Sequence, residues 1–205
     1  MTNNGLMTYF LGIQVQQNSN GISLSQEKYS RELLEKFGMG NCGVVTTPVM
    51  PNHQLSIEED GAEVDATQYK RLIGSLRYLT MTRPDIEYGV RLLSRYMEAP
   101  KKSHWQATKR ILRYVKGTLT MGLHYVCGVK FKLIGYSDSE WGRDPLERKS
   151  TTGYVFFGGS AAFSWTSNKQ SIIALSSCDA EYVALASTVC EAIWLKNLLI
   201  ALKHP

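Results

Sequence analysis

The sequence has few cysteines, and none of them lies in a metal-binding spacing. Its 205 residues contain four, Cys42, Cys127, Cys178 and Cys190, without a Cys-x-x-Cys pair. This pattern predicts neither a zinc ribbon nor a disulfide scaffold, so a reducing compartment is expected. The histidines also lack the spacing of a zinc site or a Ser-His-Asp triad; they are His53, His104, His124 and His204.

Targeting and membrane signals are scarce as well. The start, Met1–Gly5, has neither a basic nor an apolar region. On a direct reading, no stretch approaches the roughly 20 apolar residues of a membrane span. We therefore expect a soluble protein of the cytoplasm or nucleus that is not secreted and has no membrane partner.

Acidic residues are missing from one long stretch. Residues 99–137 contain no Asp or Glu, although the net charge of the chain is only +5. From charge alone, a basic helix side here could be an ordinary solvated face, but the acid-free context favours contact with phosphates. The basic residues of this stretch are Lys101, Lys102, Lys109, Arg110, Arg113, Lys116, Lys130 and Lys132.

The apolar pattern of the first half predicts a hairpin followed by helices. With 43% hydrophobic residues, the chain is long enough for one or two packed domains. Tyr9–Gln16 and Ile22–Leu24 favour strands around a turn. An acidic stretch with Glu58, Glu59 and Asp60 reads as a solvated linker. The expected helices cover Glu27–Phe37, a segment from the cap Asp65 through Thr80, Pro84 to about Met97, and a segment from Ser103 to Gly117.

The second half begins with strands. Short apolar runs at Phe131–Tyr136, Gly153–Phe157 and Ala162–Trp165 are separated by polar turns, which is typical of three strands. Ser176 or Ser177 then caps a long helix that carries Tyr182 and several further apolar residues. Trp141, Trp165 and Trp194 are expected to be packing residues rather than base-stacking platforms.

Three stretches, in order, resemble Ty1/copia-type retroelement polyproteins. The first, Tyr9–Ile13 with Leu24–Tyr29, is similar to the last palm strands and thumb of the reverse transcriptase. The second resembles the connection between polymerase and nuclease and consists of Leu72–Leu79, Thr82–Ile86, His104-Trp105 and Lys109–Gly117. The third resembles the ribonuclease H region and consists of Gly135-Tyr136-Ser137-Asp138-Ser139-Glu140-Trp141, Arg148-Lys149-Ser150-Thr151-Thr152-Gly153-Tyr154 and Leu175-Ser176-Ser177-Cys178-Asp179-Ala180-Glu181-Tyr182.

This resemblance implies a domain order and an α+β fold. Residues 1–50 would form palm strands and thumb, residues 51–66 an acidic linker, and residues 67–128 a helical connection. Residues 129–205 would form a ribonuclease H-like domain with an incomplete mixed sheet and a long helix. The implied parent activity is RNA-templated DNA synthesis with hydrolysis of RNA in RNA:DNA hybrids.

The resemblance also implies a metal site. Two metal ions about 4 Å apart can activate water and stabilise the leaving oxygen in phosphodiester hydrolysis. Asp138, at the end of the first strand, and Glu181, in the first turn of the helix, would hold Mg²⁺ or Mn²⁺. Taken singly, Asp138 fits a turn residue and Glu181 a first-turn acid favoured by the helix dipole. Glu140 and Asp179 are nearby but less suitable ligands.

Two departures from the family pattern limit the expected activity. The sequence contains no Tyr-x-Asp-Asp, which the family places upstream of Tyr9, so polymerisation is not expected. The family's third carboxylate, on a strand after the long helix, is also missing, so impaired cleavage is expected. An alternative is an active nuclease whose site is completed by another chain or another carboxylate.

A further alternative is a non-catalytic nucleic-acid-binding or interaction module built on the basic helices. The nucleic-acid-binding candidates are Lys109, Arg113 and Lys116, with Arg148 and Lys149 near the metal site. They would grip the backbone of an RNA:DNA hybrid or another duplex. The unpaired strand Phe131–Tyr136 would offer an edge for self-association.

Overall fold

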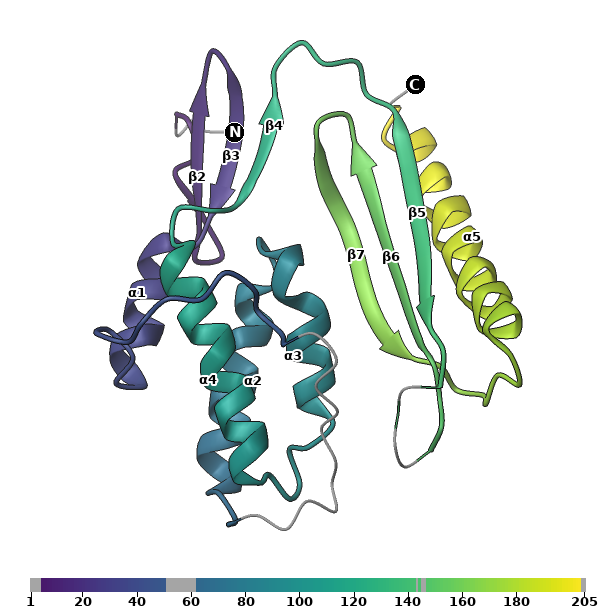
Figure 1. Ribbon diagram of the computed structural model, residues 1–205. Helices are drawn as coiled ribbons and strands as arrows, with labels where there is room; N and C mark the ends of the chain where they lie inside the picture. The colour runs from purple at the N-terminus through teal and green to yellow at the C-terminus, as the bar shows by residue number, and fades with distance from the viewer. Residues whose placement is uncertain (1–4, 51–61, 143, 145–146, 204–205) are drawn as a thin grey trace. The chain divides into compact units, whose positions relative to one another are not determined.

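The computed structural model describes residues 5–50, 62–142, 144 and 147–203. The chain divides into two compact units, residues 1–128 and 129–205, and each is considered by itself (Figure 1). Residues 51–61 of the expected acidic linker lie outside the described residues. The end of that segment has a structural role, because Glu63 forms an isolated β-bridge with Lys101.

The first unit contains an antiparallel sheet in the order β1-β2-β3-β4. The expected hairpin is present, but Leu11 and Gly12 adopt positive φ and separate β1 from β2. Asn18 Oδ1 closes the β2–β3 turn by accepting from the backbone N–H of Asn20 at 2.9 Å and of Gly21 at 3.1 Å. The sequence analysis missed β4. The strands are β1 (Tyr9–Phe10), β2 (Ile13–Asn18), β3 (Gly21–Ser25) and β4 (Leu123–Val126).

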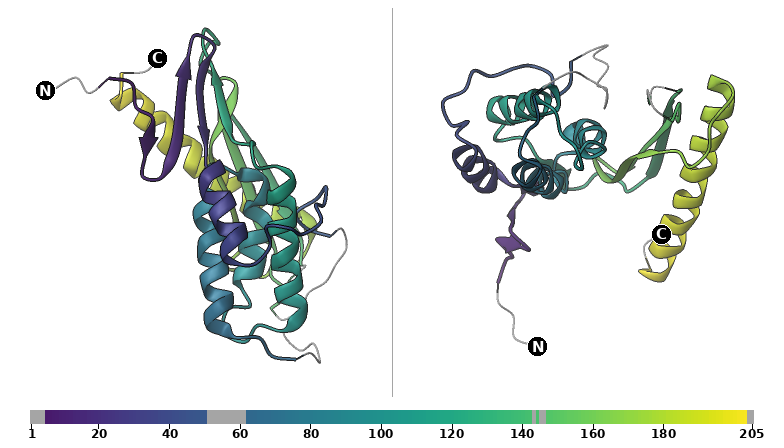
Figure 2. Two further views of the ribbon diagram at one scale, coloured as in Figure 1. Left: turned by 90° about the vertical axis from the view of Figure 1, so that its left-hand side faces the viewer. Right: turned by 90° about the horizontal axis from the view of Figure 1, so that it is seen from below.

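Helices gather beside this sheet into a bundle (Figures 1 and 2). Asp65 caps α2 as predicted, accepting from the backbone N–H of Thr67 at 2.8 Å and of Gln68 at 3.3 Å. The segment after Pro84 starts as a 3₁₀ turn, and its helix ends earlier than expected. The elements are α1 (Glu27–Lys36), α2 (Ala66–Leu79), η1 (Pro84–Ile86), α3 (Glu87–Ser94) and α4 (Lys102–Gly117).

The core of the first unit lies between α2, α3 and α4. One side of α2 carries an apolar stripe that is buried, and its members Tyr69, Leu72 and Ile73 have no exposed surface. The Tyr69 hydroxyl donates to the Leu93 carbonyl at 2.9 Å, which satisfies its polar end inside the core. Leu33 and Leu34 of α1 belong to the same cluster, so the predicted segments 1–50 and 67–128 share one core.

A buried guanidinium ties the end of α4 to the turn before α3. The Arg83 side chain is 2% exposed, and its Nε and Nη2 donate to the two carboxylate oxygens of Asp85 at 2.9 and 2.7 Å. It also donates to the Thr118 carbonyl at 2.9 Å and to Thr118 Oγ1 at 2.6 Å. The guanidinium lies 5.6 Å from the centre of the Tyr114 ring. Each of these contacts offsets part of the cost of burying the charge.

The second unit is a three-stranded sheet with one long helix on one face (Figures 1 and 2). Its order is β5-β6-β7, with antiparallel neighbours. The expected mixed sheet is therefore wrong for the described residues, because none of them supplies a parallel strand beside β5. The elements are β5 (Leu133–Glu140), β6 (Thr151–Gly158), β7 (Ala161–Lys169) and α5 (Ser177–Ala201).

Small side chains bring α5 close to the sheet. Ala180 and Ala184 have no exposed surface, and Thr188 Oγ1 lies 3.0 Å from Ser137 Oγ. A Cβ on Gly135 would lie 2.4 Å from the Phe156 ring, so the strand position under this ring requires glycine. Among the described residues, α5 is also the one helix long and apolar enough to cross a membrane by length and composition. The direct reading of the sequence missed this.

Replacing the buried guanidinium should loosen the first unit. Arg83→Met should lower the free energy of unfolding by about 3 kcal/mol, since it removes four hydrogen bonds and leaves Asp85 without its partner. Arg83→Lys should recover only part of this loss, because an ammonium cannot reproduce the fork geometry. Native-state hydrogen exchange in α2 and α4 measures the effect. Arg77→Met, at an exposed position of α2, is the control, and an equal loss in both variants would contradict the role of Arg83.

The same ion pair should make the first unit sensitive to acid. Burial alone would raise the pKa of Asp85, but the hydrogen bonds and charge of Arg83 outweigh it and lower the pKa. Stability from this pair is therefore complete above the ordinary Asp pKa of about 3.9 and is lost as pH falls through the lowered value. Thermal unfolding from neutral to strongly acidic pH should show a shallower decline in Asp85→Asn. If the melting temperatures of the parent and of Asp85→Asn fell in parallel with pH, the Arg83–Asp85 pair would not be the source of the acid sensitivity.

Candidate nucleic-acid interface and carboxylate site

Glu181 lies at the open edge of β5 and is held there by one residue. Its Oε1 accepts from the Ser139 backbone N–H at 3.2 Å and from Ser139 Oγ at 2.8 Å. The side chain is exposed. Because β5 pairs only with β6 among the described strands, this carboxylate satisfies a strand-edge donor that would otherwise face water.

Asp138 lies in β5 itself, opposite Gly153 of β6. Side chains alternate between the two faces of a strand, and both Ser137 and Ser139 contact α5. Asp138 is therefore on the face of the sheet away from α5, whereas Glu181 approaches from the α5 side. The structure brings the two predicted ligands to the same strand but not to the same face.

Two carboxylates alone do not make up a two-metal centre. Magnesium requires near-octahedral oxygen ligands that point at one position. Within the described residues, no group of three or more His, Cys, Asp or Glu side chains could hold a metal ion. Glu140 shares the face of Asp138 by strand alternation. Asp179 lies in the first turn of α5, where its backbone N–H donates to Ser176 Oγ at 3.1 Å.

Two of the three predicted phosphate-binding residues of α4 also hold the loop that follows α1. Arg113 Nε donates to the Gly43 carbonyl at 2.8 Å, and Lys116 Nζ donates to the Cys42 carbonyl at 2.6 Å. Lys109 instead lies over the Trp105 ring, with Nζ 5.4 Å from its centre. Within the part of the chain that the structure describes, Lys109 is therefore the one of these three cations without a backbone anchor.

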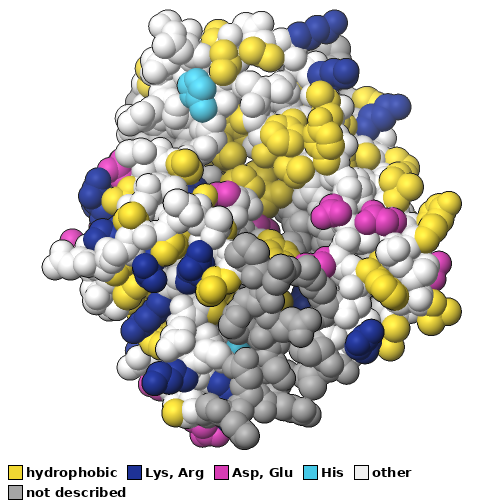
Figure 3. Space-filling view, in the orientation of Figure 1, with side chains coloured by type: hydrophobic (Ala, Val, Ile, Leu, Met, Phe, Trp, Pro, Cys, Tyr) yellow, Lys and Arg dark blue, Asp and Glu magenta, His cyan; other side chains and the backbone are white. Residues whose placement is uncertain are grey.

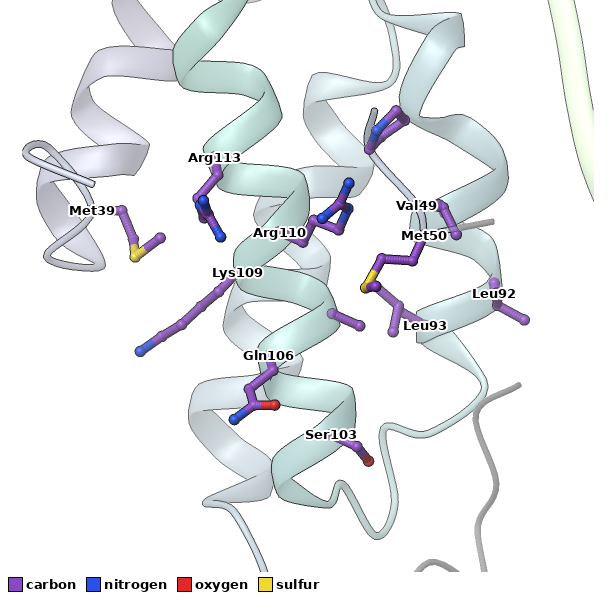
Figure 4. A pocket seen from close by; sticks show the side chains of 13 residues that line it. Met39, Val49, Met50, Leu92, Leu93, Ser103, Gln106, Lys109, Arg110 and Arg113 are labelled. Carbon is purple, nitrogen blue, oxygen red and sulfur yellow. The ribbon is translucent and has the colours of Figure 1, made fainter. Parts of the chain in front are cut away.

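The same side of α4 borders a pocket of about 480 Å³. Figure 4 shows Lys109, Arg110 and Arg113 extending from α4, with Arg110 towards Val49 and Met50. Arg110 Nη2 donates to Thr47 Oγ1 at 2.8 Å. Arg110 Nε and Ser103 Oγ are buried without a hydrogen-bond partner among the described residues. The sequence analysis did not select Arg110, although it lies in the acid-free stretch.

The second predicted basic site is partly neutralised. Lys149 Nζ lies 2.6 Å from Glu147 Oε2, while Lys169 binds both Asp144 and Glu147. Hydrogen bonds from Lys149 and Lys169 lower the pKa of Glu147. Burial alone would lower the pKa of Lys169, but the two carboxylates outweigh it and raise the pKa. Arg148 is exposed and forms no ion pair with another described residue.

Several aromatic and imidazole side chains differ from expectation. Trp141 and Trp194 are 49% and 57% exposed, so neither of them lies in the core. Trp141 still packs through its Nε1, which donates to the Ala174 carbonyl at 3.1 Å. His104 is buried and stacks on Tyr96, with ring centres 3.9 Å apart. Its Nδ1 accepts from the Lys101 backbone N–H at 3.0 Å, which is a structural role at the start of α4.

Comparison with known proteins identifies clear relatives. The chain is 41% identical over 194 residues to the retrovirus-related Pol polyprotein from transposon RE1 of Arabidopsis thaliana, a match that covers 95% of the chain. It is 41% identical over 199 residues, 92% of the chain, to the corresponding polyprotein from transposon TNT 1-94 of Nicotiana tabacum. The matched regions make up 13% and 15% of those two polyproteins.

A shorter protein is similar to the chain at a comparable level of sequence identity. An uncharacterized mitochondrial protein of Arabidopsis thaliana is 37% identical over 190 residues, which cover 93% of the chain and 79% of that protein. No family model matches the chain, and no solved structure matches it.

Proposed function

Because the chain belongs to the copia-type retrotransposon Pol polyproteins, we propose that it is a nucleic-acid-binding part of such a polyprotein. Its partner is the sugar-phosphate backbone of an RNA:DNA hybrid or a similar duplex. The observation that carries this proposal is the basic side of α4, where Lys109, Arg110 and Arg113 border one pocket. They lie within a stretch without Asp or Glu.

The contacts of these cations support recognition of phosphate rather than of bases. The Arg110 guanidinium borders the pocket, and its Nε has no hydrogen-bond partner among the described residues. Aliphatic side chains such as Val49, Met50 and Leu93 line the pocket, and no Phe, Tyr or Trp is among its lining residues. Base stacking is therefore not expected there, and binding should depend little on sequence.

Reverse transcription and hydrolysis of RNA in hybrids are proposed for the family's longer polyproteins, with this chain as a part of that machinery. We assign no polymerisation to these residues, because the sequence contains no Tyr-x-Asp-Asp. We also derive no metal-dependent step, since Asp138 and Glu181 approach β5 from opposite faces of the sheet.

A charge reversal should separate phosphate contact from structural support. Lys109→Glu with Arg148→Glu should weaken binding to an RNA:DNA hybrid, because both side chains lack a backbone anchor among the described residues. The slope of log K against log salt should become shallower by about 0.9 per lost phosphate contact. Fluorescence anisotropy at several salt concentrations measures both quantities. The control is Lys70→Glu on the exposed side of α2, and unchanged affinity and slope in the double variant would overturn the proposal.

A metal-dependent nuclease is the second candidate, favoured by the exposure of both Asp138 and Glu181 near the end of β5. The purified chain, incubated with a labelled hybrid in magnesium or manganese, should bind it without metal-dependent cleavage. Cleavage that Asp138→Asn abolishes and Asp179→Asn preserves would instead establish the nuclease. That result would mean that the carboxylates are brought to one face on binding.

A further inference from the structure

The two sides of α5 differ in what covers them. On the sheet side, Ala180, Ala184 and Leu195 are buried. On the opposite side, large apolar side chains are exposed over the length of the helix, and hydrophobic surface is visible over α5 in Figure 3. We call this set the outer stripe; it consists of Tyr182 (68% exposed), Leu185 (50%), Val189 (47%), Ile193 (56%) and Ile200 (62%).

The spacing of the outer stripe places its members on one side of the helix. Steps of three, four, four and seven residues follow the helical period, so the stripe continues from Tyr182 to Ile200. At 1.5 Å per residue it is about 27 Å long, and with a helix about 10 Å wide it covers about 300 Å² in projection. Exposed apolar patches of this size on soluble proteins commonly mark interaction sites.

A lipid bilayer is a poor occupant for the stripe, although α5 is long and apolar enough to span one. Insertion would break the hydrogen bonds of the sheet side, where Thr188 bonds Ser137 and Ser164 Oγ donates to Glu191 at 3.1 Å. Adsorption to a membrane surface would favour basic flanks. The first turns of α5 instead carry Asp179 and Glu181.

We propose that the outer stripe is the contact surface for a second copy of this chain, with the two α5 helices antiparallel. This arrangement places the acidic first turns of one helix beside the end of the other, where Lys203 follows α5. The two helix dipoles are then also opposed. Tyr182 of one copy meets Ile200 of the other, and Val189 and Ile193 lie near the two-fold axis.

The second unit also has an open edge at β5 among the described strands. Glu181 occupies the Ser139 N–H, and by strand alternation the N–H groups of Leu133, Gly135 and Ser137 point to the same open edge. These donors can extend the contact between copies. The area remains below the roughly 800 Å² per partner of a standard stable interface, so the dimer is weak and depends on concentration. This proposal does not rest on nucleic-acid binding.

Sedimentation velocity of the full chain over a wide concentration range tests the association. The parent chain should shift from monomer to dimer, and Val189→Asp with Ile193→Asp should remain monomeric. Met121→Asp, at a position of the first unit that is 53% exposed, is the matched control and should dimerise like the parent. Circular dichroism confirms that each variant is folded; if the double variant is not, Val189→Asp alone replaces it. A parent chain that stays monomeric, or a folded stripe variant that still dimerises, would refute the proposal.

Cross-linking tests the orientation of the helices. With the four native cysteines replaced by Ser, mild oxidation should join a Tyr182→Cys copy to an Ile200→Cys copy. Disulfides between two Tyr182→Cys copies alone would indicate parallel helices and overturn the antiparallel arrangement. Flotation with neutral phosphatidylcholine vesicles tests the alternative that the outer stripe binds a lipid surface. Vesicle binding by a monomeric parent chain, lost in the stripe variant, would assign the stripe to lipid.

Discussion

The first unit depends on one buried charge and the hydrogen bonds that make its burial possible. Arg83 ends the turn after α2, and its guanidinium binds Asp85 at the start of the next helical segment and Thr118 just after α4. The turn before α3 and the segment after α4, which are distant in sequence, are therefore joined through one planar group. Nearby, Gln26 makes a similar link, since its Oε1 accepts from Thr82 Oγ1 at 2.9 Å and its Nε2 donates to the Tyr78 carbonyl at 3.4 Å. These polar anchors orient the helices, while the apolar stripe of α2 supplies the burial energy.

The candidate interface uses the cations of α4 in two ways. Arg113 and Lys116 hold the carbonyls of Gly43 and Cys42, so part of the basic side serves the fold. Lys109 has no backbone anchor among the described residues, and Arg110 Nε is buried there without a hydrogen-bond partner. The proposed phosphate contact would therefore use a helix side that also supports the fold. Substitution of single residues is needed to separate the two roles.

The alternation of side chains along β5 determines which residue meets Glu181. Asp138 and Ser139 are neighbours in the motif that resembles the ribonuclease H region. Because successive side chains of a strand point to opposite faces of the sheet, these two side chains lie on different faces. The Ser139 side chain donates a hydrogen bond to Glu181, whereas strand alternation places the Asp138 side chain on the other face of the sheet. Along α5 the helical period has the same effect. It assigns Ala180 and Ala184 to the sheet and leaves the outer stripe without cover among the described residues.

Local pattern alone determined much of this protein: the α2 stripe, the Asp65 cap, the β2–β3 hairpin, the three strands before α5 and the family resemblance. These follow from side-chain periodicity and hydrogen bonds between near neighbours in sequence. Only the tertiary structure decided that β4 pairs with β3, that Arg83 is buried, and that Trp194 and the outer stripe are exposed. It also decided that Glu181 bonds Ser139 at the edge of β5. The physical reason is that each of these outcomes depends on which distant segment occupies a given face, and periodicity identifies a face without identifying its partner.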